Sequence, residues 1–210
     1  MSGLDQCNPG IEVSRDATAS LTFNIGTNTI AGSISTVINV FSGGGPGNAI
    51  GDVKNNIVTG SGLGGNQFGI RLFNSGSAAT GFGTMNVNAA NNTVNGIDNA
   101  YPILAESSGS TGAGGLLKVA LTGNTSTVVA GGTALDSTRL QARNASTICA
   151  KVSGNTTNAG GPGFFGIQLR EASTGAFSLE GLALGPQVDP TARNYVIAQS
   201  PGAATRGATI

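Results

Sequence analysis

Residues 21–30, LTFNIGTNTI, alternate apolar and polar side chains from Leu21 to Ile25 and then place Asn28 before a second short apolar stretch. Alternation with a period of two is typical of a strand that buries one face. The pattern returns at residues 49–58, 85–94, 117–126 and 148–157. In all five copies an asparagine holds the same place, and these residues are Asn28, Asn56, Asn92, Asn124 and Asn155, at intervals of 28, 36, 32 and 31 residues.

Three apolar positions precede each of these asparagines. The nearest position holds Ile25, Val53, Ala89, Leu121 and Val152. The middle position holds Phe23, Gly51, Val87, Val119 and Ala150. The farthest position holds Leu21, Ala49, Met85, Leu117 and Ile148. The repetition of a whole apolar face predicts that these strands stack on one another.

A second family of strands follows each asparagine by 10 to 16 residues. Its members are Thr36-Ile38-Val40, Phe68-Ile70-Leu72, Tyr101-Ile103-Ala105, Thr138-Leu140-Ala142 and Phe165-Ile167-Leu169. Ile11 and Val13 match this family and indicate an earlier, incomplete turn of the chain. Glycine-rich turns of variable length separate the two families.

A repeat of about 30 residues with short strands predicts an all-β fold, a right-handed parallel β-helix (solenoid) of about six rungs. Rungs stack at ~4.8 Å, so identical positions lie over one another. The repeated asparagine is then an internal ladder, in which each amide bonds the amides above and below. We expect one domain over residues 1–210, with the rungs in residues 1–188. A glycine-rich β-sandwich is the rival fold, but it does not explain the register of the asparagines.

Two segments carry a family resemblance. The first is Cys149 to Thr156 followed by Gly166 to Arg170, and the second is Leu179 to Leu182 followed by Tyr195 to Gln199. In these segments the chain resembles the pectate-lyase-like parallel β-helix superfamily, and more closely the C-terminal β-strand-repeat regions of large bacterial secreted or surface proteins. The resemblance covers most of the chain in architecture and only these segments in detail. It implies the fold and an extracellular or cell-surface location.

Composition narrows the possible functions. The chain has 35 glycines, no histidine, and ten basic and ten acidic residues. Without histidine there is no Ser-His-Asp or Cys-His apparatus, and without a basic cluster a nucleic-acid partner is not expected. The sequence contains no apolar run of 18 residues, so no membrane span is predicted. The first residues lack the features of a signal peptide. We expect no cofactor and no metal.

The last residues break the repeat. Asp189 and Pro190 suit the start of a helix, and Ala192, Tyr195, Val196 and Gln199 then share one face. We therefore expect a helix over residues 189–200 that caps the stack, with residues 201–210 as a tail. The alternative is one more irregular strand with Val196 in an apolar position. No similar cap is visible before Ile11, which suggests further rungs in a longer protein, or two copies that meet there.

The two cysteines are not expected to pair with each other. Cys7 precedes the first rung and Cys149 lies on the fifth, which separates them by roughly 24 Å along the axis. A disulfide needs Cα atoms within about 7 Å. Each cysteine is then a plain thiol, or has a partner in another segment or chain.

Outward positions of the second strand family hold the candidate site residues. One set is Asn39, Arg71, Leu104, Gln141 and Gln168, and the other is Phe41, Phe73, Glu106, Arg143 and Arg170. Glu106 with Asp98 or Asp136 is the candidate acid–base pair of a saccharide-cleaving enzyme, and Arg143 is the candidate base of a lyase. The simpler interpretation is a surface ion-pair ladder of Glu106, Arg143, Arg170 and Glu171, and we favour it.

Binding candidates lie on the same strands. They are Phe41, Phe73, Arg71, Arg143 and Arg170, with Leu104 beside the two rings. Outward aromatic rings stack on sugars or pack against a partner chain; the alternative is that Phe41 and Phe73 turn into the core. A Thr-rich position after each ladder asparagine, namely Thr29, Ile57, Thr93, Thr125 and Thr156, is an imperfect version of an ice-binding array.

The expected function is therefore non-enzymatic, a rigid structural or adhesive module of a bacterial surface or secreted protein. The first alternative is a carbohydrate-active or polysaccharide-binding β-helix that uses the face around Glu106 and Arg143. The second alternative is an ice-binding solenoid. A polysaccharide or another protein chain is the expected partner.

Overall fold

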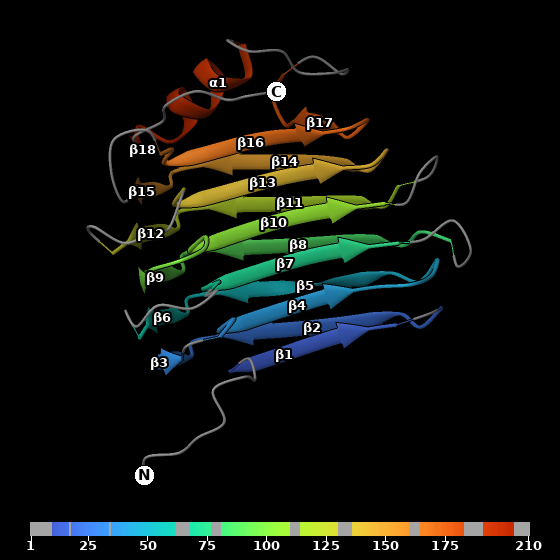
Figure 1. Ribbon diagram of the computed structural model, residues 1–210, viewed down its shortest axis with the longest axis horizontal. Helices are drawn as coiled ribbons and strands as arrows, with labels where there is room; N and C mark the ends of the chain where they lie inside the picture. Colours follow the sequence, from blue (N-terminus) through green and yellow to red (C-terminus); the bar gives the residue numbers. More distant parts are fainter. Residues whose placement is uncertain are drawn as a thin grey trace.

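The computed structural model describes residues 10–16, 18–33, 35–61, 68–76, 81–109, 114–129, 136–159, 164–182 and 191–203. Within these residues the chain winds into a parallel solenoid of three sheets with six strands each, and one helix lies at the end of the stack (Figure 1). Consecutive strands go to different sheets, and each strand pairs in parallel with its equivalent in the next rung. The sequence prediction of an all-β parallel solenoid is confirmed.

The three sheets follow one another around each rung. Sheet A contains β1 (Ile11–Arg15), β4 (Ile38–Ser42), β7 (Ile70–Ser75), β10 (Ile103–Ser108), β13 (Thr138–Arg143) and β16 (Ile167–Ala172). Sheet B contains β2 (Leu21–Gly26), β5 (Ala49–Lys54), β8 (Thr84–Ala90), β11 (Leu116–Thr122), β14 (Thr147–Ser153) and β17 (Ala176–Leu179). Sheet C contains β3 (Thr29–Ser33), β6 (Ile57–Gly60), β9 (Thr93–Ile97), β12 (Thr125–Val128), β15 (Thr156–Asn158) and β18 (Gly202–Ala203).

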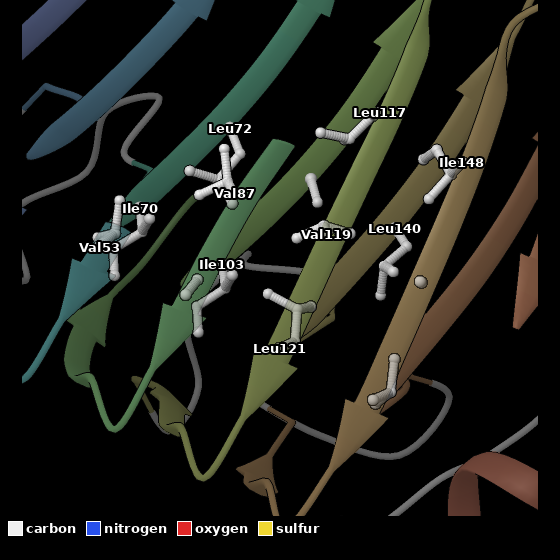
Figure 2. Packing of buried hydrophobic residues seen from close by; sticks show 14 of the residues in the cluster. Val53, Ile70, Leu72, Val87, Ile103, Leu117, Val119, Leu121, Leu140 and Ile148 are labelled. Atoms are coloured by element: carbon white, nitrogen blue, oxygen red, sulfur yellow. The ribbon is translucent and has the colours of Figure 1, made fainter. Parts of the chain in front are cut away.

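The core is built from the apolar positions that the repeat predicts. The three apolar positions of sheet B stack in unbroken register from β2 to β14, and they form one cluster with sheet A side chains such as Ile103 and Leu140 (Figure 2). Gly51 is the one residue in these apolar positions that has no side chain. A Cβ there would lie 2.6 Å from the Phe23 ring, so the ring occupies the space that a side chain would need.

The asparagine ladder is confirmed at all five residues. Asn56 illustrates it, because its backbone N–H and its Nδ2 both donate to Asn92 Oδ1, at 3.1 and 2.9 Å. Its Nδ2 also donates to the Ile25 carbonyl of the preceding rung at 3.0 Å. Asn92 and Asn124 repeat this pattern. The buried amides of the ladder are thereby satisfied, which avoids the cost of an unpaired polar group at this position.

The turn into the ladder needs a left-handed residue. The residue before each ladder asparagine has a positive φ, and these residues are Thr27, Asn55, Asn91, Gly123 and Gly154, with φ between 55° and 65°. Glycine and asparagine adopt this conformation readily, whereas a β-branched residue does so at a cost. Thr27 is therefore the one strained member of the series.

One strand of sheet A differs from the predicted register. Ile103 pairs with Thr138, and Ala105 pairs with Leu140, so the predicted equivalence of Thr138-Leu140-Ala142 with the other triplets is wrong by two residues. The reason is a buried hydroxyl cluster. Ser126 Oγ lies 3.0 Å from Thr138 Oγ1 and 2.7 Å from Ser137 Oγ. These bonds let Thr138 occupy an interior position that is isoleucine in the neighbouring rungs.

The predicted C-terminal helix is present as α1, Thr191–Gln199. Ala192 and Val196 are buried and Tyr195 packs against the core cluster, whereas Gln199 is exposed, although it was predicted on the same face. Asp189 and Pro190, its predicted start, lie outside the described residues. The predicted tail begins with β18, whose Gly202 and Ala203 pair with β15.

Candidate functional site

The outer face of sheet A carries every predicted binding residue and Glu106. The register defines two outward series. One runs through Glu12, Asn39, Arg71, Leu104, Arg139 and Gln168, and the other through Ser14, Phe41, Phe73, Glu106, Gln141 and Arg170. Because β13 is shifted by two residues, Arg139 and Gln141 hold the places that the sequence assigned to Gln141 and Arg143. Arg143 lies further along, level with Ser108.

Phe73 and Arg71 form the centre of this face. The Phe41 and Phe73 rings stack with centroids 5.6 Å apart, and both side chains are half-buried on the outer face rather than in the core. The Arg71 guanidinium lies over the Phe73 ring at 4.4 Å and over the Phe68 ring at 5.5 Å. Burial lowers the pKa of Arg71, and the charge of Glu106 opposes this shift. Its Nε is buried without a hydrogen-bond partner.

A second guanidinium lies beside this group. Arg139 lies over the Tyr101 ring at 4.1 Å and forms a buried ion pair with Asp136 at 2.9 Å. Asp136 also accepts a hydrogen bond from the Phe165 backbone N–H at 2.9 Å. Burial raises the pKa of Tyr101, which its neighbour Arg139 partly offsets. Asp136 is thus a structural anchor of this face.

The carboxyl groups of the predicted acid–base pair have other partners. Asp136 is engaged by Arg139 and by the Phe165 backbone N–H, and Glu106 is engaged by Arg143. The role of Glu106 as an acid or base in glycoside hydrolysis stays a prediction. Asp98 lies half-buried before the first residue of β10, whereas Glu106 lies inside that strand.

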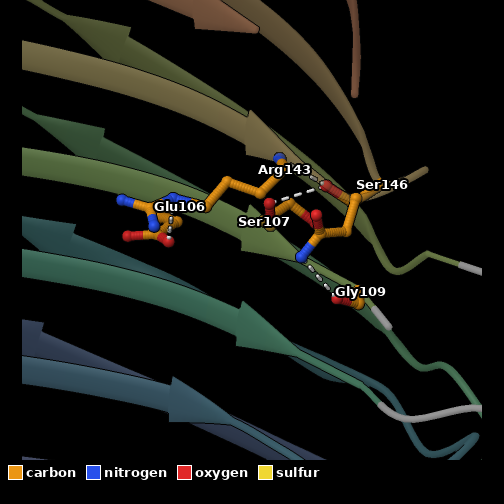
Figure 3. Close-up of polar contacts among 6 residues, drawn as sticks. Glu106, Ser107, Gly109, Arg143 and Ser146 are labelled. Atoms are coloured by element: carbon orange, nitrogen blue, oxygen red, sulfur yellow. Dashed lines mark hydrogen bonds and ion pairs between the residues drawn. The ribbon is translucent and has the colours of Figure 1, made fainter. Parts of the chain in front are cut away.

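Glu106 is held by Arg143 instead. The Nε of Arg143 lies 3.0 Å from Glu106 Oε1, and Figure 3 shows this pair beside the turn that joins sheet A to sheet B. In the same turn Ser146 Oγ donates to the Ser107 carbonyl at 2.6 Å, and Asn144 Nδ2 donates to the Gly109 carbonyl at 3.1 Å. The turn therefore holds the backbone next to Arg143, whereas the Arg143 side chain is exposed.

The predicted ion-pair ladder is formed in part. Glu106 and Arg143 pair, whereas Glu171 accepts a hydrogen bond from the Phe177 backbone at 3.1 Å. Arg170 is exposed at the end of its series. Leu104 is only 3% exposed and Gln141 only 1%. The sequence had suggested that Leu104 extends an exposed apolar patch, but the side chain is too buried for that. The exposed side chains of the face are Glu12, Ser14, Arg143 and Arg170, whereas Phe41, Arg71 and Phe73 are half-buried.

Sequence reasoning missed a second polar series inside the solenoid. It runs along the sheet A–sheet B turn through Arg15, Ser42, Asn74 and Ser107, and then changes to Ala142. Arg15 is only 2% exposed, and its guanidinium donates to Ser42 Oγ at 3.0 Å and to the Gly45 carbonyl at 3.1 Å. Asn74 Nδ2 donates to the Gly83 and Leu116 carbonyls. These residue types differ from rung to rung, so no repeat reveals them.

The outer faces of the other two sheets are also organised. Sheet B has two adjoining shallow hollows of about 570 and 290 Å³, both lined in part by Asn86. On sheet C the predicted Thr29-Ile57-Thr93-Thr125-Thr156 series is in register. The structure adds a second outward series with Thr59 and Thr127, which Ala31, Asn95 and Asn158 interrupt. The ice-binding alternative stays a prediction.

Other predicted features lie partly outside the described residues. Cys149 is a half-buried free thiol, and Cys7 lies outside the described residues, so their separation stays a prediction. Among the described residues no three His, Cys, Asp or Glu side chains gather as a metal site. No helix in the described part of the chain is long and apolar enough to cross a membrane.

Comparisons with protein-family models, with curated proteins and with solved structures gave no match.

Proposed function

We propose that the chain is a non-enzymatic structural or adhesive module of a bacterial surface or secreted protein. The observation that carries this proposal is the uninterrupted stack, in which three six-stranded sheets enclose one core and a continuous amide ladder. Such a stack holds its outer side chains at fixed spacing over its whole length. The cell-surface location rests on the resemblance of the segments around Cys149 and Leu179.

The second candidate is a polysaccharide-binding module that uses the outer face of sheet A. Stacked rings of Phe41 and Phe73 offer the apolar surface on which sugar rings pack. The Arg71 guanidinium lies over both the Phe68 and the Phe73 ring, so its planar group is held against this aromatic surface. This arrangement favours binding over cleavage, because Glu106 is already paired with Arg143 and Asp136 with Arg139.

A glycan array separates the two candidates. A binding module should retain oligosaccharides, and Phe73→Ala should reduce the retained signal at least tenfold, since the ring supports both Phe41 and Arg71. Ile57→Ala, an exposed apolar change on sheet C, is the matched control and should leave the signal unchanged. If the native chain binds no glycan, the polysaccharide candidate fails and the structural module stands.

Cleavage is tested on the same polysaccharides. We expect no new reducing or unsaturated ends with the native chain, because Glu106 is engaged by Arg143 and Asp136 is engaged by Arg139. Cleavage that Glu106→Gln abolishes would contradict the non-enzymatic proposal. Arg170→Gln changes an exposed charge on the same face and serves as the control.

A further inference from the structure

The two ends of the solenoid differ in what covers their outermost strands. At one end α1 lies over the last rung, with Ala192 and Val196 buried against the core (Figure 1). At the other end β1, β2 and β3 are the outermost strands of their sheets and pair on one side only within the described residues. In that first rung Phe23 and Ile25 are buried, but four apolar side chains are only partly buried, namely Ile11, Val13, Leu21 and Ile30. A hydrogen-bonding edge and an apolar surface therefore lie together at this end.

The asparagine ladder has a direction, and this direction defines what fits each end. In each rung the backbone N–H and Nδ2 of the asparagine donate to Oδ1 of the next rung, and that Oδ1 accepts both bonds. At the capped end Ser200 closes the series, because its Oγ accepts from Asn155 N–H and Nδ2 at 3.2 and 3.4 Å. Ser200 is fully buried, and α1 places it there.

The first rung leaves the opposite group open. Asn28 donates to Asn56 Oδ1, but within the described residues its own Oδ1 accepts no hydrogen bond. Its Nδ2 turns to the Gly26 carbonyl of its own rung at 3.3 Å. In the later rungs the equivalent bond goes to a carbonyl of the preceding rung, as from Asn56 to Ile25. The end thus presents an acceptor and lacks the carbonyl that a preceding rung supplies.

A second copy of the chain does not complete this end. Two copies that meet face to face would each present Asn28 Oδ1 as an acceptor, and the ladder donors of Asn28 are already used within each copy. The two-fold symmetry of such a dimer would also make every strand pair across the contact antiparallel, unlike the pairs within the stack. The head-to-tail contact is blocked by α1, which covers the only end of opposite polarity.

We infer that the end formed by β1, β2 and β3 is an interaction surface for one further parallel rung that has asparagine at the ladder position. Such a rung supplies an N–H and an Nδ2 to Asn28 Oδ1 and a carbonyl to Asn28 Nδ2. Its strands pair with the open edges of β1, β2 and β3, and its apolar side chains cover Ile11, Leu21 and Ile30. The partner must match the donor–acceptor direction of the asparagine ladder and the register of the three strands, so an unrelated strand does not replace it.

A tandem chain tests this inference. A copy of residues 70–102, one complete rung, is inserted directly before Ile11 of the full chain. The register supports this junction, because Ile11, Ile38, Ile70 and Ile103 occupy equivalent positions and residue 102 normally precedes Ile103. Amide hydrogen exchange of β1, β2 and β3 is compared with that of the native chain. The matched control carries leucine in place of the copied asparagine, at the position equivalent to Asn92.

The added rung should slow amide exchange in β1, β2 and β3 at least tenfold, and the leucine control should lose most of this protection. Unchanged exchange in the tandem chain would overturn the inference, as would equal protection with asparagine and leucine. Sedimentation of the native chain tests the rival occupant. A concentration-dependent dimer that Asn28→Leu dissolves would show that a second copy binds this end, and would also overturn the inference.

Discussion

Two polar series run through the interior of this solenoid, and they follow opposite rules. The ladder at the sheet B–sheet C turn repeats one residue type and one hydrogen-bond pattern in rung after rung. The series at the sheet A–sheet B turn passes through Arg15, Ser42, Asn74 and Ser107, each with its own partners. In the regular series each member completes its neighbours, so one substitution breaks bonds in two adjoining rungs, whereas in the irregular series a substitution breaks only the bonds of that residue. The following predictions test this difference between the two series.

The largest loss is expected for Asn124→Leu. This change removes the Nδ2 that donates to Asn155 Oδ1 and to the Ala89 carbonyl, and it leaves the Asn92 N–H and Nδ2 without their acceptor. Several buried groups become unsatisfied at about 1 to 3 kcal/mol each, so the free energy of unfolding should fall by about 3 to 5 kcal/mol. Denaturant unfolding measures it. Asn91→Gly, at an exposed positive-φ position, is the control; a loss of less than about 1 kcal/mol in the leucine variant would contradict the ladder's role.

Arg15→Met should be the next most damaging change. Arg15 is buried, and the substitution keeps an apolar stem while it removes the donors to Ser42 and to the Ala19 and Gly45 carbonyls. A loss of about 2 to 3 kcal/mol is expected in the free energy of unfolding. Arg170→Met, at an exposed position, should change it by less than about 0.5 kcal/mol. Equal effects of the two substitutions would mean that Arg15 has no interior role.

Ser107→Ala should cost only about 1 kcal/mol. Its hydroxyl donates one bond, to the Gly115 carbonyl at 3.1 Å, and the next residue in its series is already Ala142. This position therefore accepts a methyl group without a new void. Thermal unfolding compared with that of Asn124→Leu provides the measurement. A loss as large as in the ladder variant would show that the two series are equally cooperative.

Thr27→Asn should stabilise the chain, by about 1 kcal/mol. Thr27 has a φ of 58°, a strained value for a β-branched residue, whereas asparagine holds the same place at Asn55 and Asn91. The substitution at exposed Thr27 removes strain without a change in the core. An increase in the melting temperature is the readout, and Thr29→Asn, at the first residue of β3, should not reproduce it.

The smallest effect concerns alkaline pH. Burial raises the pKa of Tyr101 above its ordinary value of about 10, so the folded state disfavours the phenolate. The stability that Tyr101 contributes is present below its ordinary pKa and is lost as the pH rises through the raised pKa of the folded state. Tyr101→Phe should therefore flatten the decline of stability above about pH 10. The same alkaline slope in both chains would contradict this prediction.

Much of the fold follows from the sequence because repetition makes equivalent positions visible. The five ladder asparagines and the three apolar positions of sheet B stand in the register that their spacing predicts. The capping helix is equally visible, because Ala192 and Val196 have helical spacing. The repeat failed at β13, where Leu140 resembles Ile103 more than Thr138 does, yet the hydroxyls of Ser126 and Ser137 hold Thr138 in that place.

The candidate site was less predictable. The outward places of Phe41, Phe73 and Arg71 followed from alternation, but the contact of Arg71 with the Phe68 ring depends on a residue before the strand begins. The pairing of Glu106 with Arg143 arises although the two residues are not level in the register.

The sequence by itself determined the stack, its register in sheet B, the ladder and the cap, because each depends on a local pattern that recurs every rung. Only the tertiary structure decided the interior place of Arg15, the closure of the ladder by Ser200, and the pairing of Glu106 with Arg143. The physical reason is that these features depend on contacts between residues up to 45 positions apart, which occur once and leave no periodic trace. For the same reason, the unused acceptor Oδ1 of Asn28 can be recognised only when the direction of the hydrogen bonds along the whole ladder is known.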